Sequence, residues 1–170
     1  MEACKIILLS VAAAVGYGIL HDQVTARVCV EYFTVGHPRI FPTEDPTLLA
    51  MGWGTLATWW FGLFLGIPLA LISRLGPPPR LPAGALLKPI LILLLGVGSI
   101  ALVAGCIGYL SAGAAFAPLV EPAIVRLPLE KRAPYLADSC AHAAAYVAGF
   151  ILGTMVWAWA WRQRDAEKGR

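Results

Sequence analysis

The chain has 170 residues, of which 59% are hydrophobic and 14% are charged, and its formal net charge is +3. A soluble domain carries about 25% charged residues, so this chain has too few polar side chains to cover a water-facing surface. The composition therefore predicts an integral membrane protein that lies in the lipid bilayer. The small and dispersed net charge excludes a nucleic-acid-binding protein, which needs a concentrated basic face.

Four apolar segments are long enough to cross a bilayer as helices, since about 20 residues at 1.5 Å per residue span a core of roughly 30 Å. They cover approximately residues 6–20, 48–73, 87–116 and 141–161. Their cores contain no Asp, Glu, Lys or Arg, and the alternating pattern of a membrane β-barrel is absent. The sequence thus predicts one integral membrane domain over residues 1–170, an all-α, four-transmembrane-helix bundle with two structured outer loops.

The first apolar segment follows Lys5 and resembles a signal peptide, but no small-x-small cleavage site lies near its polar end. We therefore expect a retained first helix. It leads into a polar stretch, residues 21–38, with the sequence HDQVTARVCVEYFTVGHP. If the helix continues to about residue 35, then Gln23, Arg27 and Glu31 share one face, and Arg27 can pair with Glu31. The β-branched residues also fit a strand, but no second strong strand is present to pair with it, so we favour the helix.

The later elements have recognisable boundaries. The second apolar segment follows Thr43 and Asp45, either of which can cap its first turn. Prolines interrupt the outer connection, residues 117–136, so only short helical pieces such as 123–127 are expected there. The last helix is expected to begin near Pro134, because proline suits a first-turn position.

Lys and Arg are unequally divided between the two sides of the predicted bundle. One side carries eight of them: Lys5, Arg74, Arg80, Lys88, Arg162, Arg164, Lys168 and Arg170. The other side carries five: Arg27, Arg39, Arg126, Lys131 and Arg132. Because the side with more Lys and Arg faces the cytoplasm, both termini are predicted to be cytoplasmic, and both polar loops to face outward.

Small residues recur at every fourth position in three of the segments, which indicates close helix packing in lipid. The three stripes are Gly54, Thr58, Gly62 and Gly66; Ala104, Gly108 and Ala112; and Ala145, Gly149 and Gly153. We expect them to pack inside the bundle. One stripe could instead bind a membrane protein partner or a second copy of the chain.

The polar stretch supplies the candidate ligand-binding residues. They are polar or ionisable side chains next to the membrane: His21, Asp22, Gln23, Arg27, Glu31 and His37. Tyr17 and His21 form a pair at a spacing of four nearer the membrane.

A second constellation lies at the head of the last segment, where Asp138, His142 and Tyr146 fall on one helical stripe. Asp138 can accept a hydrogen bond from His142, which would orient the imidazole and raise its basicity. In an enzyme, His142 would act as a general base, and Arg27 would hold a negatively charged group. An Asp–His pair that only joins loop to helix is the alternative interpretation.

Metal and cysteine patterns are less specific. The three histidines and nearby carboxylates have suitable donor atoms, but their spacing matches no metal motif, so we predict no metal site and no cofactor. Cys29 and Cys140 both fall on the predicted outer side, where an oxidising compartment would allow a disulfide between them.

The string His-Asp-Gln-x-Thr-x-Arg, followed by Glu-Tyr-Phe-Thr, occupies residues 21–34, and GWGTLATWW occupies residues 52–60. This combination resembles a family of uncharacterised small bacterial integral membrane proteins. The resemblance covers residues 16–75. It implies a bacterial inner (plasma) membrane location and transfers no catalytic residue.

No nucleotide-binding glycine loop and no Ser/His/Asp ordering is present. We therefore expect a binding or assembly component whose outward-facing polar site takes a partner or a small ligand. A membrane-surface enzyme acting on a lipid or lipid-linked substrate is the first alternative. A small transporter subunit is the second alternative, and it is weakened by the lack of charge in the predicted spans.

Overall fold

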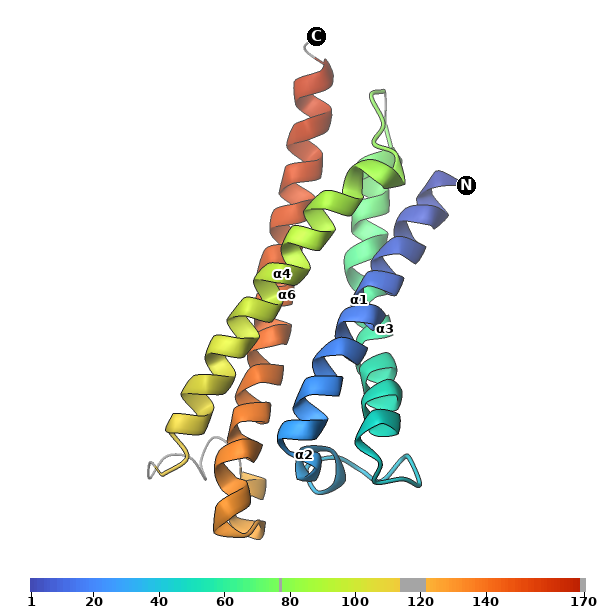
Figure 1. Ribbon diagram of the computed structural model, residues 1–170. Coiled ribbons are helices and arrows are strands. Elements are labelled where there is room, and N and C mark those ends of the chain that lie inside the picture. Colours follow the sequence, from blue (N-terminus) through green and yellow to red (C-terminus); the bar gives the residue numbers. More distant parts are fainter. Residues whose placement is uncertain (77, 114–121, 169–170) are drawn as a thin grey trace.

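The structure, a computed structural model, describes residues 1–76, 78–113 and 122–168. These residues form helices and no strand: α1 (Glu2–Val28), α2 (Val30–Thr34), α3 (Pro46–Arg74), α4 (Ala83–Leu110), the 3-10 helix η1 (Pro122–Arg126) and α6 (Leu129–Lys168) (Figure 1). The helices α1, α3, α4 and α6 are long and apolar enough to cross a membrane. The predicted all-α membrane protein with a four-helix bundle is confirmed.

Several predicted boundaries change. The helix in the polar stretch is confirmed, but α1 ends at Val28 because Cys29 adopts an extended backbone, and α2 starts after it. The last helix begins at Leu129 and continues through Pro134, so the expected start was wrong. Helix α4 ends at Leu110, and the predicted end near residue 116 lies outside the described residues.

Two predicted local features are confirmed. Asp45 caps α3, since its carboxylate accepts a hydrogen bond from the Leu48 main-chain N–H at 2.9 Å, and Pro46 fills the first turn. The expected short helical piece is η1.

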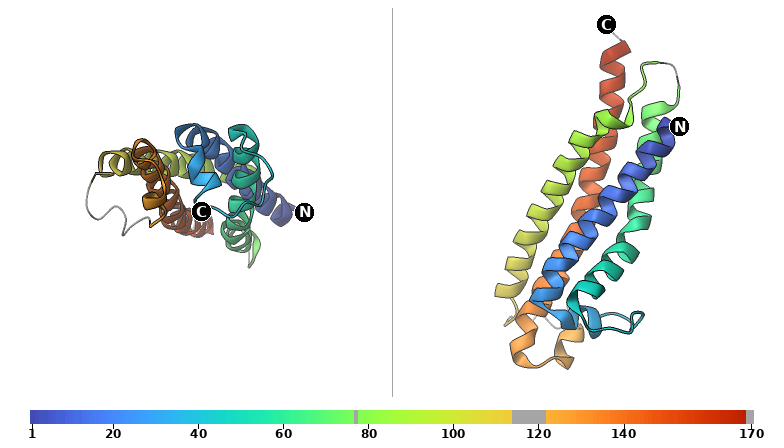
Figure 2. Two further views of the ribbon diagram at one scale, coloured as in Figure 1. Left: turned by 90° about the horizontal axis from the view of Figure 1, so that it is seen from below. Right: turned by 45° about the vertical axis from the view of Figure 1, so that its right-hand side comes forward.

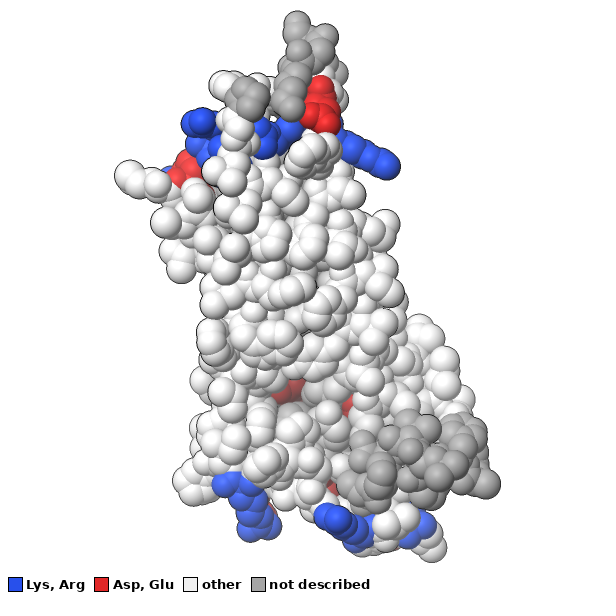
Figure 3. Space-filling model, turned by 180° about the vertical axis from the view of Figure 1, so that it is seen from behind, with Lys and Arg blue, Asp and Glu red and all other residues white. Residues whose placement is uncertain are grey.

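The bundle is elongated, and α1 begins at the same end at which α6 ends (Figure 1). The opposite end carries α2 and η1, and we call it the α2 end. Charged side chains gather at both ends of the face in Figure 3, with a long uncharged surface between them, as lipid exposure requires. Between the two charged ends, a recess towards the α2 end exposes a few acidic atoms.

The four long helices form two pairs. Helix α1 packs along α3 and α4 packs along α6, whereas the two pairs meet less closely (Figure 2). Gly54 of α3 lies against the α1 main chain, so that a Cβ at this position would be 2.6 Å from the nitrogen of Ile19. Gly108 of α4 lies against the main-chain oxygen of Leu136 on α6. Each pair is therefore joined through glycines that let two backbones approach.

The small-residue stripe of α6 faces the other pair, since Gly149 lies against the ring of Phe61 and Gly153 against Leu65, both on α3. The three predicted stripes thus pack within the chain. Association with a partner or a second copy stays a prediction.

A few polar contacts tie the two pairs together. Trp157 of α6 donates a hydrogen bond to the Leu65 main-chain oxygen at 2.9 Å. Near the chain termini, the buried Arg164 donates to the main-chain oxygens of Pro79, at 2.9 Å, and of Ile72. These bonds fix α6 against α3 and the loop that follows α3.

Candidate functional site

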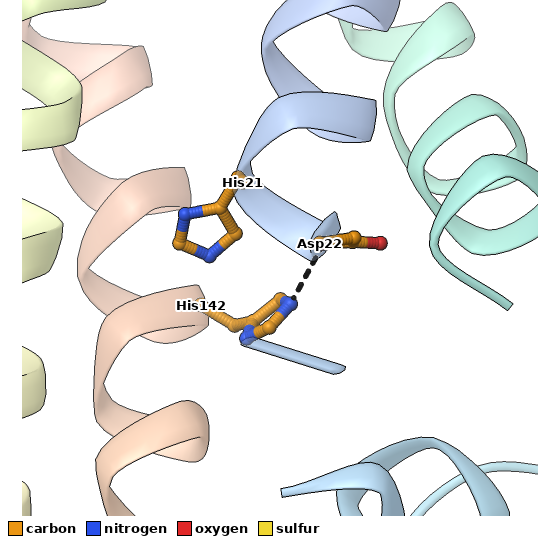
Figure 4. A group of neighbouring side chains, drawn as sticks. All are labelled: His21, Asp22 and His142. Carbon is orange, nitrogen blue, oxygen red and sulfur yellow. Dashed lines mark hydrogen bonds and ion pairs between the residues drawn. The ribbon is translucent and has the colours of Figure 1, made fainter. Parts of the chain in front are cut away.

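Two helices that belong to different pairs bring three ionisable side chains together towards the α2 end. His21 and Asp22 lie on α1, and His142 lies on α6 (Figure 4). The Nε2 atom of His142 is 3.1 Å from Oδ1 of Asp22, and the two imidazole rings meet edge to face with centroids 4.6 Å apart. One donor atom from each residue lies within 4.8 Å of the other two. We call these three residues the polar cluster.

The polar cluster is shielded from solvent. The side chain of Asp22 is 6% exposed and that of His142 is 15% exposed. The ring of Tyr32 stacks on His142, with centroids 4.4 Å apart, and the ring of Tyr17 stacks on His21 at 5.6 Å. An ionisable group that a transmembrane helix carries towards the bundle interior is expensive and is usually functional.

The hydrogen bonds of His142 fix its tautomer. Its Nδ1 lies 2.8 Å from the main-chain oxygen of Asp138. A carbonyl oxygen only accepts, so Nδ1 carries the hydrogen, and in the neutral ring Nε2 then holds a lone pair. That lone pair would face the carboxylate of Asp22, another acceptor. The 3.1 Å contact is therefore favourable only when a positive charge, a proton or a metal cation, is present between them.

The surroundings of the polar cluster hold unused hydrogen-bonding capacity. Among the residues that the structure describes, the buried Nε2 of His21, the hydroxyl of Tyr17 and Oδ2 of Asp138 have no hydrogen-bond partner. Leaving one such buried group unsatisfied costs about 1–3 kcal/mol. A bound molecule or ion that satisfied these atoms would recover this free energy.

A cavity of about 100 Å³ runs between the two helix pairs from the polar cluster towards the chain termini. Its polar end is lined by Tyr17, Tyr146 and the polar cluster, and its far end by Leu69 and Trp157. Most of the remaining lining is apolar. On α1 the lining extends over residues 10–22, which is about 18 Å along a helix, so the cavity is long.

A second hollow, of about 500 Å³, lies under the loop that follows α2. Its charged lining residues are Arg39 and Glu44, which form an exposed ion pair at 3.5 Å. It contains no buried ionisable group among its lining residues, so the polar cluster and its cavity are the stronger candidate.

The predicted ligand-binding residues do not all reach the cavity. Gln23 and Arg27 join α1 to α3, since Arg27 donates to Oε1 of Gln23 at 2.6 Å and to Oγ1 of Thr47 at 2.8 Å. The predicted Arg27–Glu31 pair was wrong. Helix α1 ends before Cys29, so Arg27 and Glu31 do not lie on one continuous helix. Glu31 instead pairs with Lys131 of α6 at 2.8 Å.

The remaining residues of the polar stretch also have structural partners. His37 donates from Nδ1 to the main-chain oxygen of Tyr32 at 2.9 Å and packs on Trp53, apart from the polar cluster. The thiol of Cys29 donates to Glu31 at 3.3 Å, and burial together with this carboxylate raises the pKa of Cys29 to about 12.

The stripe on α6 forms, but with different partners. His142 uses the main-chain oxygen of Asp138 and the carboxylate of Asp22, so the predicted carboxylate partner was wrong. Tyr146 donates to the Ala57 main-chain oxygen of α3 at 2.9 Å. Arg27 is held by Gln23 and Thr47, so it does not join the stripe.

No disulfide joins the described residues Cys29 and Cys140. They pack in different clusters, Cys29 with Leu127 and Tyr135 and Cys140 with Ile124 and Leu136.

Asp22 was predicted as a ligand-binding residue of the polar stretch, outside the membrane, because the first span was expected to end near Leu20. The apolar helix in fact continues to Val28, which makes Asp22 a carboxylate within a candidate membrane span. A carboxylate within a membrane helix is the signal that marks Asp22 as a candidate functional residue.

Comparisons of the chain with protein-family models, curated proteins and solved structures found no match. The resemblance to small bacterial membrane proteins stays a prediction.

Proposed function

We propose that the protein is a binding protein of the bacterial inner membrane that holds a slender amphipathic molecule between its helices. The apolar chain of this molecule lies in the cavity, and its polar head contacts the polar cluster. The observation that carries the proposal is the cavity itself, which is mostly apolar along its length and has His21, Asp22 and His142 at its α2 end.

The shape of the cavity defines the ligand class. A small cavity of about 100 Å³ that follows α1 over about 18 Å favours a slender apolar chain over a bulky ring system. Pockets that enclose a drug-sized molecule measure roughly 300–1,000 Å³, well above this volume.

The polar end defines the head group. The hydroxyl of Tyr17 and Nε2 of His21 both line the cavity, and both are without a hydrogen-bond partner among the described residues. A head group with a hydroxyl, carbonyl or carboxylate would satisfy them, because a hydroxyl both donates and accepts and an imidazole nitrogen does either. The head group of the proposed ligand therefore contains oxygen atoms that form hydrogen bonds with Tyr17 and His21.

The division of Lys and Arg supports an orientation with both termini in the cytoplasm. In this orientation the polar cluster lies in the outer half of the bilayer and the chain of the ligand extends towards the inner half. The enzyme alternative lacks its expected anion-binding residue at the site, since Arg27 is held by Gln23 and Thr47.

The test compares the molecules that co-purify with three proteins extracted in polymer discs, so that no detergent can fill the cavity. Ala145 lines the cavity, and Ala145→Phe adds a ring to it. Ala143 lies on the exposed face of the same helix, so Ala143→Phe is the matched control. Solvent extraction and mass spectrometry identify the bound species.

We expect one single-chain amphiphile in amounts comparable to the protein from the wild type and Ala143→Phe, and its loss from Ala145→Phe. Identical extracts from all three proteins, or only bulk bilayer lipid in the wild type, would contradict the proposal.

A further inference from the structure

The polar cluster has the donor set of a transition-metal site. Two imidazole nitrogens and one carboxylate oxygen are the ligands that Zn²⁺ and its neighbours in the first transition row accept, whereas Mg²⁺ and Ca²⁺ prefer oxygen ligands alone. A catalytic or ligand-binding zinc site commonly has three such protein ligands and keeps its fourth position for another group. His21, Asp22 and His142 match this number and these types.

The distances between the donor atoms are close to those of a metal site. With metal–ligand bonds of about 2.0–2.2 Å, neighbouring ligand atoms in a tetrahedron lie roughly 3.3–3.5 Å apart. Nε2 of His142 and Oδ1 of Asp22 are already 3.1 Å apart, and the donor atom of His21 is within 4.8 Å of both. Closing the site requires a movement of at most about 1.5 Å, which a side-chain rotation of His21 provides.

The outer contacts of His142 are those of a metal ligand. Its Nδ1–H donates to the Asp138 main-chain oxygen, which orients the ring and directs the Nε2 lone pair at Asp22. Metal-binding histidines almost always use their second nitrogen in this way. A divalent cation between Nε2 and the carboxylate turns a contact between two acceptors into two coordination bonds.

The position of His21 supplies the independent observation. Its Nε2 is buried and has no hydrogen-bond partner among the described residues, although the imidazole of His142 lies edge-on beside it. The same ring spacing excludes a haem, because rings with centroids 4.6 Å apart leave no room for a porphyrin between them.

We infer that His21, Asp22 and His142 bind a divalent transition-metal ion of the Zn²⁺ class, with the fourth coordination position facing the cavity. Two neutral imidazoles and one carboxylate leave one positive charge on a bound dication. An anionic oxygen ligand in the fourth position would neutralise that charge inside the membrane. The inference stands on the cluster alone and does not require a chain in the cavity.

The test uses Co²⁺ as a visible probe. The full-length protein carries a tag without histidines, is treated with a chelator and is then titrated with Co²⁺ while its visible absorption is recorded. The variants are His142→Gln and Asp22→Asn, and His37→Gln is the matched control because His37 bonds to Tyr32 outside the cluster.

We expect visible bands that saturate at a single equivalent of Co²⁺ and are displaced by Zn²⁺ in the wild type and His37→Gln, and their loss in both cluster variants. No saturable band in the wild type, or equal binding by all four proteins, would overturn the inference.

A second measurement needs no variant of the cluster. Zn²⁺ should protect His21 and His142 of the wild type from diethylpyrocarbonate and leave His37 reactive, as mapped by peptide mass spectrometry. Equal modification of all three histidines with and without Zn²⁺ would overturn the inference. Ala145→Phe should retain Co²⁺ binding while it loses the amphipathic ligand. This variant therefore distinguishes a failure of the metal site from a failure of the proposed ligand binding.

Discussion

Gly54 offers a sharp test of how the first helix pair is held together. In Gly54→Ala, the new Cβ would lie 2.6 Å from the nitrogen of Ile19 and 2.7 Å from the carbonyl carbon of Gly18. Non-bonded carbon atoms rest at about 3.5–4.0 Å, so α1 and α3 would have to separate by roughly 1 Å at this point. The atoms in contact belong to the main chain and cannot rotate away. Overpacking of this kind costs about 1–3 kcal/mol.

The matched control is Gly16→Ala on α1, because a Cβ at this position meets nothing within 4 Å. Both variants gain the same helix propensity, about 1 kcal/mol, so the difference between them isolates the contact. The free energy of unfolding of each variant is measured by circular dichroism in mixed micelles with increasing dodecyl sulfate. We expect Gly54→Ala to be less stable than Gly16→Ala by about 1–3 kcal/mol. Equal stability of the two variants would refute the reasoning.

Two further predictions concern the α2 end. Glu31→Gln removes the 2.8 Å ion pair with Lys131 and should lower the free energy of unfolding by about 0.5 kcal/mol at neutral pH. Burial opposes the shift, but the hydrogen bonds from Lys131 and Cys29 hold the pKa of Glu31 below its ordinary value of 4.5. The difference from the wild type should therefore be complete above that value and vanish as pH falls through the lowered pKa; a difference that persists in acid would count against the ion pair. The buried thiol of Cys29, with its pKa raised to about 12, should react far more slowly with a maleimide at neutral pH than the exposed Cys4. After unfolding without a reductant, the thiol of Cys29 should react fully with the maleimide. Failure of Cys29 to react would reveal a disulfide.

The fold follows from the sequence because lipid imposes a simple demand. A run of apolar residues that crosses the bilayer must satisfy its own main chain, and only a helix does so within one segment. The end of α1 was harder to predict. The sequence allowed the helix to continue to about residue 35, but Cys29 adopts φ −151° and ψ 95° between two valines, and the chain turns there. Such a local break depends on what Cys29 packs against.

The site was predictable only in its local parts. Helical spacing correctly put Tyr17 beside His21 and Asp138 one turn before His142, but the bond to His142 uses the main-chain oxygen of Asp138 and not the predicted carboxylate. The contact between His142 and Asp22 joins residues 120 positions apart, and it depends on how α1 and α6 are rotated towards each other. No periodic pattern specifies that rotation. It follows from the glycine contacts within each pair and the few bonds between the pairs.

The division into two helix pairs has a consequence for biogenesis. Each pair consists of long helices that follow one another in the chain, and the first pair is complete before the ribosome has made the second. His21 and Asp22 enter the membrane with the first pair, but His142 arrives with the last helix. The polar cluster therefore does not exist in a partly translated chain. Until α6 packs against α1, the carboxylate of Asp22 has no contact with His142. The step that closes the bundle is therefore also the step that forms the site.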